Sequence, residues 1–189
     1  MYKRQANNPS KASHLVGGSL RYEFIQSVDT DNNGFIDAVD YRIIMNYYYN
    51  CDATANNIYE NASLTNPQWM PGGSQYTIEV GLYAHDDPTT IYPQTVTSYP
   101  KYGSELVLSL DTLKWVELDN PSGCLTGNNI CIFLASYSAV TRLSVINPSN
   151  NQPVIGGYHV VHERCCRNSG INNIQGSGGV GMTYYAYIP

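Results

Sequence analysis

Alternation of apolar and polar residues marks several stretches of the chain and constrains the fold more than any other feature. In the stretch 75–85, one face carries Tyr76, Ile78, Val80 and Leu82. Successive side chains of a β-strand point to opposite faces, so this period of two predicts a strand with one buried face. Similar strand-like stretches lie at 17–26, 41–51, 130–146, 156–166 and 181–189. The stretch 104–123 is interpreted as two short strands.

The chain as a whole therefore predicts an all-β protein without a convincing amphipathic helix. Turn-forming residues are abundant, and 17 tyrosines suit half-buried pleated surfaces. About eight to ten strands of this kind predict an antiparallel β-sandwich or jelly-roll-like fold. We expect a single domain over 15–189, preceded by a polar N-terminal tail over 1–14.

The charge pattern excludes some partners. Charged residues make up 13% of the 189-residue chain, and the net charge is −5. A nucleic-acid surface needs clustered lysine and arginine, which this chain lacks, so no nucleic-acid partner is expected. No stretch approaches the ~20 apolar residues of a membrane-spanning helix, so no membrane span is expected.

The run DTDNNGFIDAVDY, residues 29–41, matches a calcium loop. Loops of the EF-hand type place oxygen ligands at positions 1, 3, 5, 7, 9 and 12, with glycine at position 6. Counted from Asp29, Gly34 falls at position 6 and the apolar Ile36, expected to point inward, at position 8. The ligands expected for Ca²⁺ are Asp29, Asp31, Asn33, Phe35 through its carbonyl, Asp37 and Asp40. Aspartate at position 12 resembles the dockerin-type calcium loop.

The flanks of this loop are strand-like rather than helical, so we expect a calcium loop inserted in a β-hairpin. The expected ligand shell is nearly filled by protein, and no histidine or nucleophile stands beside it. A catalytic metal keeps an open position. The ion is therefore interpreted as structural, and the alternative is an acidic turn without metal.

Five cysteines occur in this low-charge chain, and none forms a Cys-x-x-Cys pair of the kind found in zinc ribbons. We interpret them as mostly disulfides of an oxidising compartment. They are Cys51, Cys124, Cys131, Cys165 and Cys166. A local Cys124–Cys131 bond would leave Cys51 to pair with Cys165 or Cys166, although spacing alone does not fix the connectivity. The odd number leaves one thiol free or paired with another chain.

The remaining candidate sites favour structural roles, and no catalytic residue is predicted. His159 and His162 are three apart in a predicted strand, so they should point to opposite faces and not share a metal. Asp86 and Asp87 are adjacent and followed by proline, as in a turn. No nucleophile elbow, phosphate-binding loop or dinucleotide fingerprint is present, so the protein is expected not to be an enzyme.

Segments near both ends carry a family resemblance. They are His14 to Gly18, Tyr41 to Cys51, the Cys-Cys-Arg-Asn motif Cys165 to Asn168, Asn173–Ile174, and Tyr184 to Pro189. Together they resemble the N-terminal β module of large secreted surface proteins of the Bacteroidetes, of the gliding-motility-associated or PKD-domain type. Against that family pattern, the calcium loop looks like an insertion where a short turn is usual.

The resemblance implies an extracellular location on the bacterial cell surface. It also implies that Thr112, in Asp111-Thr112-Leu113, fits the O-glycosylation pattern of those bacteria. Separately, Asn61 begins an Asn-x-Ser pattern for N-glycosylation.

These observations lead to two expectations for function. The first is a calcium-stabilised structural protein that self-associates into a homopolymer, as the subunit of a surface filament or adhesin. In that case the tail 1–14 is a candidate strand for a neighbour's sheet edge. The alternative is a carbohydrate-binding or adhesive module that stacks glycans on its tyrosines. A secreted hydrolase is disfavoured because no positioned acid–base pair is evident.

Overall fold

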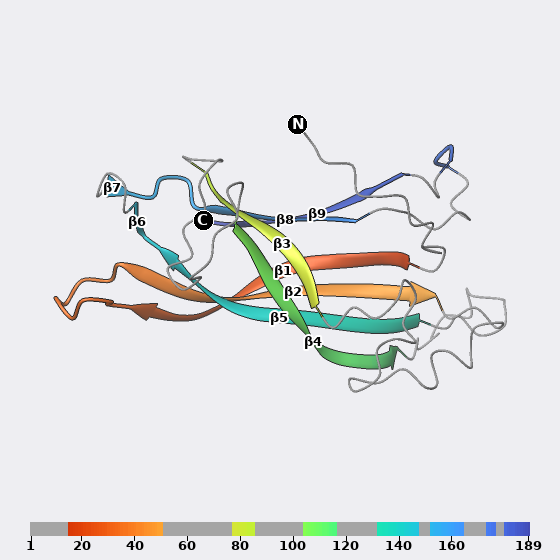
Figure 1. The fold of residues 1–189 in the computed structure, drawn as a ribbon, viewed down its shortest axis with the longest axis horizontal. Helices are drawn as coiled ribbons and strands as arrows, with labels where there is room; N and C mark the ends of the chain where they lie inside the picture. The colour runs from red at the N-terminus through yellow and green to blue at the C-terminus, as the bar shows by residue number, and fades with distance from the viewer. Residues whose placement is uncertain are drawn as a thin grey trace, which may run out of the picture.

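The computed structural model describes residues 15–50, 77–85, 104–116, 132–147, 152–164, 173–176 and 180–189. Every regular element within these ranges is a β-strand, which confirms the all-β prediction (Figure 1). The strands are β1 (Leu15–Val28), β2 (Ala38–Asn50), β3 (Thr77–Ala84), β4 (Ser104–Val116), β5 (Ile132–Ser144), β6 (Ile146–Asn147), β7 (Gln152–Pro153), β8 (Tyr158–Arg164) and β9 (Met182–Ile188).

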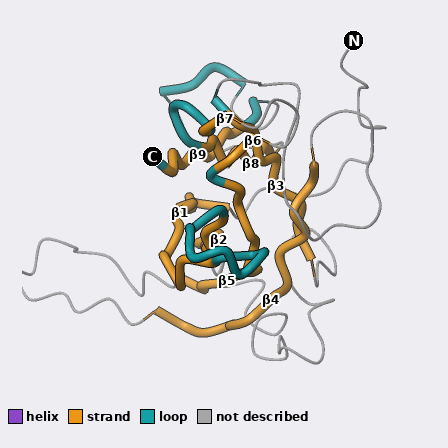
Figure 2. Tube along the Cα trace, turned by 90° about the vertical axis from the view of Figure 1, so that its left-hand side faces the viewer, coloured by secondary structure: helices purple, strands orange, loops and turns teal. Residues whose placement is uncertain are grey.

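The strands form one antiparallel sheet that curls on itself. Its seven strands run in the order β1-β2-β5-β4-β3-β8-β9, and β6 and β7 pair separately. Figure 1 shows β1, β2 and β5 in one layer and β8 and β9 in the other, with β3 crossing between them. Viewed after a 90° turn, the strands surround a common interior (Figure 2). The result is a sandwich that nearly closes into a barrel.

Alternating burial explains why these segments become strands. In β3, Ile78, Val80, Leu82 and Ala84 are buried, while Thr77 and Glu79 face outward. The inward side chains of the other strands meet them in a common core. Its other members are Leu15, Ile43, Met45, Tyr47, Tyr49, Leu108, Phe133, Ala135, Tyr137, Leu143, Tyr158, Val160 and Ile188. Burial of this apolar surface is the main favourable contribution to folding.

The edge strands β1 and β9 approach each other without pairing. A Cβ atom added at Gly18 of β1 would lie 2.9 Å from a ring carbon of Tyr184 in β9 and 2.6 Å from the carbonyl oxygen of Asn46. Such distances are too short for real atoms, so glycine at position 18 lets the Tyr184 ring reach β1. The sheet is therefore brought together at this seam by side-chain contact.

One expectation about the strands is corrected. The stretch 104–123 was expected to hold two short strands, but Ser104–Val116 is one continuous strand, β4. Its pairing with β5 shifts register between Leu110 and Thr112. A bulge of this kind accommodates an extra residue, Asp111, and lets pairing continue beyond it.

Tyr47 of β2 is fully buried and contacts strands from both layers. Its ring lies 5.8 Å from that of Tyr137 in β5 and 6.1 Å from that of Tyr184 in β9, both edge to face. The guanidinium carbon of Arg164 lies 4.8 Å from the centre of the Tyr47 ring. Such contacts add to area burial, because aromatic edges and cations are attracted to ring faces.

His162 of β8 is buried beside Tyr47, and both of its ring nitrogens are hydrogen-bonded. Its Nδ1 lies 2.7 Å from the carbonyl oxygen of Glu79, which can only accept, so Nδ1 donates. Its Nε2 is hydrogen-bonded to the hydroxyl of Tyr47. A neutral imidazole satisfies both contacts, with Nε2 accepting from Tyr47. Burial lowers the pKa of His162 from its usual 6.5.

Because the pKa of His162 is lowered in the folded state, stability should fall as the pH drops through about 6.5. Just below this pH, His162 binds a proton in the unfolded chain but stays neutral in the folded one. The free energy of unfolding should lose at most about 1.4 kcal/mol per pH unit from this group. Urea denaturation between pH 7 and pH 5 measures the slope, and His162→Gln should reduce it. Identical slopes for the two proteins would contradict this role.

Candidate metal centre

The predicted hairpin is present, and its loop spans residues 29–37 between β1 and β2. The two strands pair up to Val28 and Ala38, and the Asp37 amide donates to the Val28 carbonyl at 3.1 Å. Asn32 and Gly34 have positive φ angles of 58° and 90°, which turn the chain tightly. The loop projects at one end of the molecule, beyond the core (Figure 1).

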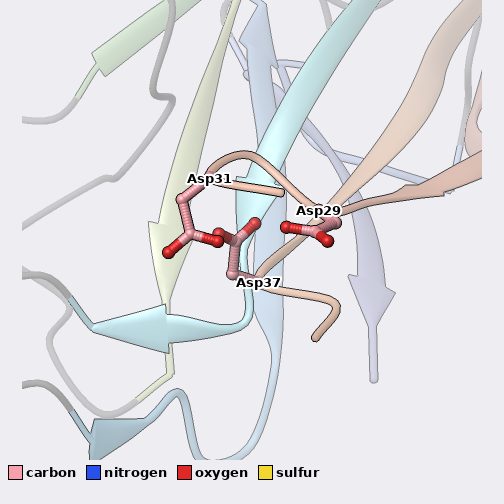
Figure 3. Close-up of side chains that lie close together, drawn as sticks. All are labelled: Asp29, Asp31 and Asp37. Carbon is pink, nitrogen blue, oxygen red and sulfur yellow. The ribbon is translucent and has the colours of Figure 1, made fainter. Parts of the chain in front are cut away.

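Three of the predicted ligands converge in this loop. One carboxylate oxygen from each of Asp29, Asp31 and Asp37 lies within 4.8 Å of the others, and the three side chains face a common point (Figure 3). Carboxylate oxygens are the ligands that Ca²⁺ prefers. Among the described residues, this is the only group of three or more acidic, histidine or cysteine side chains that meet in this way.

Backbone donors hold these carboxylates in place. Asp29 accepts from the Gly34 amide at 2.7 Å and from the Asn33 amide at 3.2 Å. These hydrogen bonds, chiefly that from Gly34, lower the pKa of Asp29 below its usual 3.8. Asp37 accepts from both the amide and the hydroxyl of Thr30. The loop thus orients these carboxylates and leaves them further lone pairs for a cation.

Asn33 lies beside this group, and Phe35 follows it at the tip. The side-chain nitrogen of Asn33 donates to Asp31 Oδ2 at 2.8 Å, and its side-chain oxygen accepts from the backbone amide of Phe35 at 2.8 Å. Ile36 was expected to point inward, but it is 57% exposed. The reason is that the loop extends past the end of the sheet, where no core lies beneath it.

Asp40, predicted as the last ligand, is placed elsewhere. It is 6% exposed and lies directly opposite Arg142 in the β2–β5 register. Its carboxylate accepts from Arg142 Nε at 2.7 Å, from Arg142 Nη2 at 3.0 Å and from Gln26 at 2.8 Å. The hydrogen bonds from Arg142, and then that from Gln26, lower the pKa of Asp40.

The strand conformation explains this departure from the calcium-loop pattern. In an EF-hand, position 12 belongs to a helix, and three residues of helix advance only about 4.5 Å. Three residues of strand advance about 10 Å. Since β2 already begins at Ala38, the chain has left the loop before it reaches Asp40.

A second group of polar side chains, not foreseen from the sequence, gathers on the outer face of β8 and β9. His159 and His162 do point to opposite faces, as predicted. His159 contacts His85 and Tyr185, at 2.9 Å and 2.6 Å respectively. Its ring also packs 5.3 Å from that of Tyr187. No short motif signals this cluster, because His85 and His159 lie far apart in the sequence.

The other predicted sites are only partly described. Thr112 is half-buried in β4. The tail 1–14, Asp86, Asp87, Asn61 and all the cysteines lie outside the described residues. Within the ranges described, no helix is long and apolar enough to cross a membrane.

Fold and loop together define an antiparallel all-β domain with an acidic loop at a hairpin tip. Comparisons with protein-family models, with curated proteins and with solved structures give no significant match. Functional inference therefore depends on the chemistry of the described residues.

The Asp40–Arg142 pair should stabilise the hairpin base independently of any metal. Arg142→Met keeps much of the side-chain volume but leaves the Asp40 carboxylate with Gln26 as its remaining side-chain partner. A largely buried charge that loses its partner is costly. We expect a melting temperature lower by several degrees, measured by circular dichroism. Arg21→Met, which removes an exposed pair with Glu23, is the control and should have little effect. Equal shifts for the two variants would contradict a special role for Arg142.

Proposed function

We propose that the protein is an extracellular structural subunit, stabilised by Ca²⁺, of a cell-surface filament or adhesin. The observation that carries this proposal is the hairpin tip, where Asp29, Asp31 and Asp37 converge. In the described residues, the only such ligand group sits on a projecting loop of an all-β domain. That arrangement suits a contact element better than a catalytic centre.

Calcium would act by neutralising the converging carboxylates. Asp31 is exposed and Asp29 and Asp37 are half-buried, so an ion can reach them from solvent. Sites of this kind in extracellular modules bind Ca²⁺ with dissociation constants of about 10⁻⁴ to 10⁻³ M, which extracellular calcium saturates in part. An ion there would hold the loop in one conformation and thereby stiffen the tip.

Exposed apolar side chains at the same tip support self-association. Phe35 is 76% exposed and Ile36, beside it, is 57% exposed. Neighbouring apolar side chains at a projecting tip gain free energy when a partner surface covers them. A second copy of the chain is the partner that a homopolymer requires. Calcium would order the backbone that carries these two side chains.

The calcium proposal predicts a melting temperature that falls on addition of EGTA and recovers with excess Ca²⁺. At a Ca²⁺ concentration ten times the dissociation constant, the gain is about 1.4 kcal/mol. Asp31→Ala combined with Asp37→Ala should abolish the response. Asp40→Asn is the matched control: it lowers stability but keeps the response, because Asp40 lies in the Arg142 pair. If EGTA leaves the melting temperature of the wild-type protein unchanged, the loop is an acidic turn that binds no metal.

The assembly proposal predicts calcium-dependent polymers, visible by electron microscopy and by sedimentation of the purified protein. Phe35→Ser combined with Ile36→Ser should shift the sedimentation profile toward monomer and leave the calcium response of the melting temperature intact. Val140→Ser, at a site 55% exposed on β5, is the control and should still assemble. A monomer under all conditions would contradict the filament role. It would favour the carbohydrate-binding alternative, for which the exposed Tyr185 and Tyr187 offer stacking surfaces.

A further inference from the structure

The outer face of β3 and β8 holds two histidines whose ring nitrogens meet. His85 follows the last residue of β3, and His159 is the second residue of β8. His85 Nδ1 lies 2.9 Å from His159 Nε2, and the ring centres are 5.1 Å apart. His85 is exposed and His159 is half-buried, so an ion from solvent can reach both. Imidazole nitrogen is a preferred ligand of divalent copper, zinc and nickel.

The backbone fixes the position of His85. Its amide donates to the Gly157 carbonyl at 2.9 Å, which ties the end of β3 to the turn before β8. Gly156 in that turn has a φ of 81°, and a Cβ atom there would lie 2.7 Å from Cγ of the His85 ring. Glycine is therefore needed both for the backbone conformation and for the space that the ring occupies.

The ring of His159 is oriented by a neighbour on β9. Its Nδ1 lies 2.6 Å from the Tyr185 hydroxyl, and the two rings stack with centres 5.7 Å apart. This contact engages Nδ1 and leaves Nε2 directed at His85. Metal-binding histidines commonly have their second ring nitrogen engaged by a hydrogen-bonding partner, which sets the tautomer and raises affinity.

We propose that His85 Nδ1 and His159 Nε2 form a two-ligand site for a divalent transition-metal ion, with Cu²⁺ preferred. Metal–nitrogen bonds are about 2.0–2.1 Å long, so two nitrogens 2.9 Å apart subtend an angle of about 90° at one ion. This is the angle between neighbouring ligands in a tetragonal Cu²⁺ site, and it is smaller than the ~109° of tetrahedral Zn²⁺. Water completes the coordination.

Binding replaces the hydrogen bond between the two rings. The nitrogen that donates in this hydrogen bond gives up its proton, and the other nitrogen of the same ring takes one up from solvent, so both rings stay neutral. Each ring then turns so that the lone pairs of His85 Nδ1 and His159 Nε2 meet at the ion. The metal is not oxidised or reduced. The site is independent of the calcium proposal, because Ca²⁺ prefers oxygen ligands and the acidic loop joins β1 and β2, whereas the histidines lie at β3 and β8.

The test is titration of the intact, calcium-loaded protein with Cu²⁺, followed by calorimetry and electron paramagnetic resonance. We expect one ion per chain, an axial spectrum with nitrogen hyperfine structure, and binding at least tenfold tighter than that of Zn²⁺. His85→Gln and His159→Gln should each weaken binding more than tenfold. Tyr185→Phe should weaken it several-fold through loss of ring orientation, with an unchanged circular dichroism spectrum.

Control variants locate the ion. His14→Gln, in the N-terminal tail, and Asp31→Ala combined with Asp37→Ala, in the acidic loop, should both retain the wild-type affinity. If either variant abolishes binding, the ion lies elsewhere and the proposal is wrong. It is also wrong if the two variants of the histidine pair bind Cu²⁺ as tightly as the wild type. A tenfold preference for Zn²⁺ would overturn the tetragonal geometry.

Discussion

The burial of Tyr47 is the interaction on which the two-layered structure depends. Along the sheet, β2 is separated from β8 by β5, β4 and β3, so no backbone hydrogen bond links them. The Tyr47 side chain crosses the interior instead, with its hydroxyl on His162 and its ring against Tyr184. Burial raises the pKa of Tyr47, so the phenol stays neutral and donates to the histidine. A single side chain thus provides both apolar contact and a satisfied polar link between the layers.

The base of the acidic hairpin is tied to the same layer. Asp37 accepts the Val145 amide at 2.8 Å through its carbonyl, while its carboxylate belongs to the loop. Three residues further along the chain, the Asp40–Arg142 ion pair joins β2 to β5. The base of the loop is therefore hydrogen-bonded to β5 and to the residue that follows β5. A cation at the tip would act on the loop alone and would not be required for the sheet.

Local sequence patterns predicted much of this structure, because strand alternation and ligand spacing in a loop depend only on neighbouring residues. The alternation in β3 and the convergence of Asp29, Asp31 and Asp37 both follow from positions a few residues apart. The place of Asp40 did not follow, because its partner Arg142 comes from a distant strand. The same is true of His85 and His159, which only the β3–β8 pairing brings together. Long-range pairing decides such contacts, and periodicity in one segment carries no information on it.

The seam between β1 and β9 has a consequence for how the chain acquires its structure. Gly18 and Tyr184, which meet there, come from strands at opposite ends of the sheet order. The environment of Tyr47 is likewise incomplete until β8 and β9 have been made. Folds dominated by contacts between residues far apart in the sequence form slowly, because a long loop must close before each contact can stabilise the chain. During synthesis, the surface of β1 and β2 that packs against β8 and β9 therefore stays exposed until those two strands have been made.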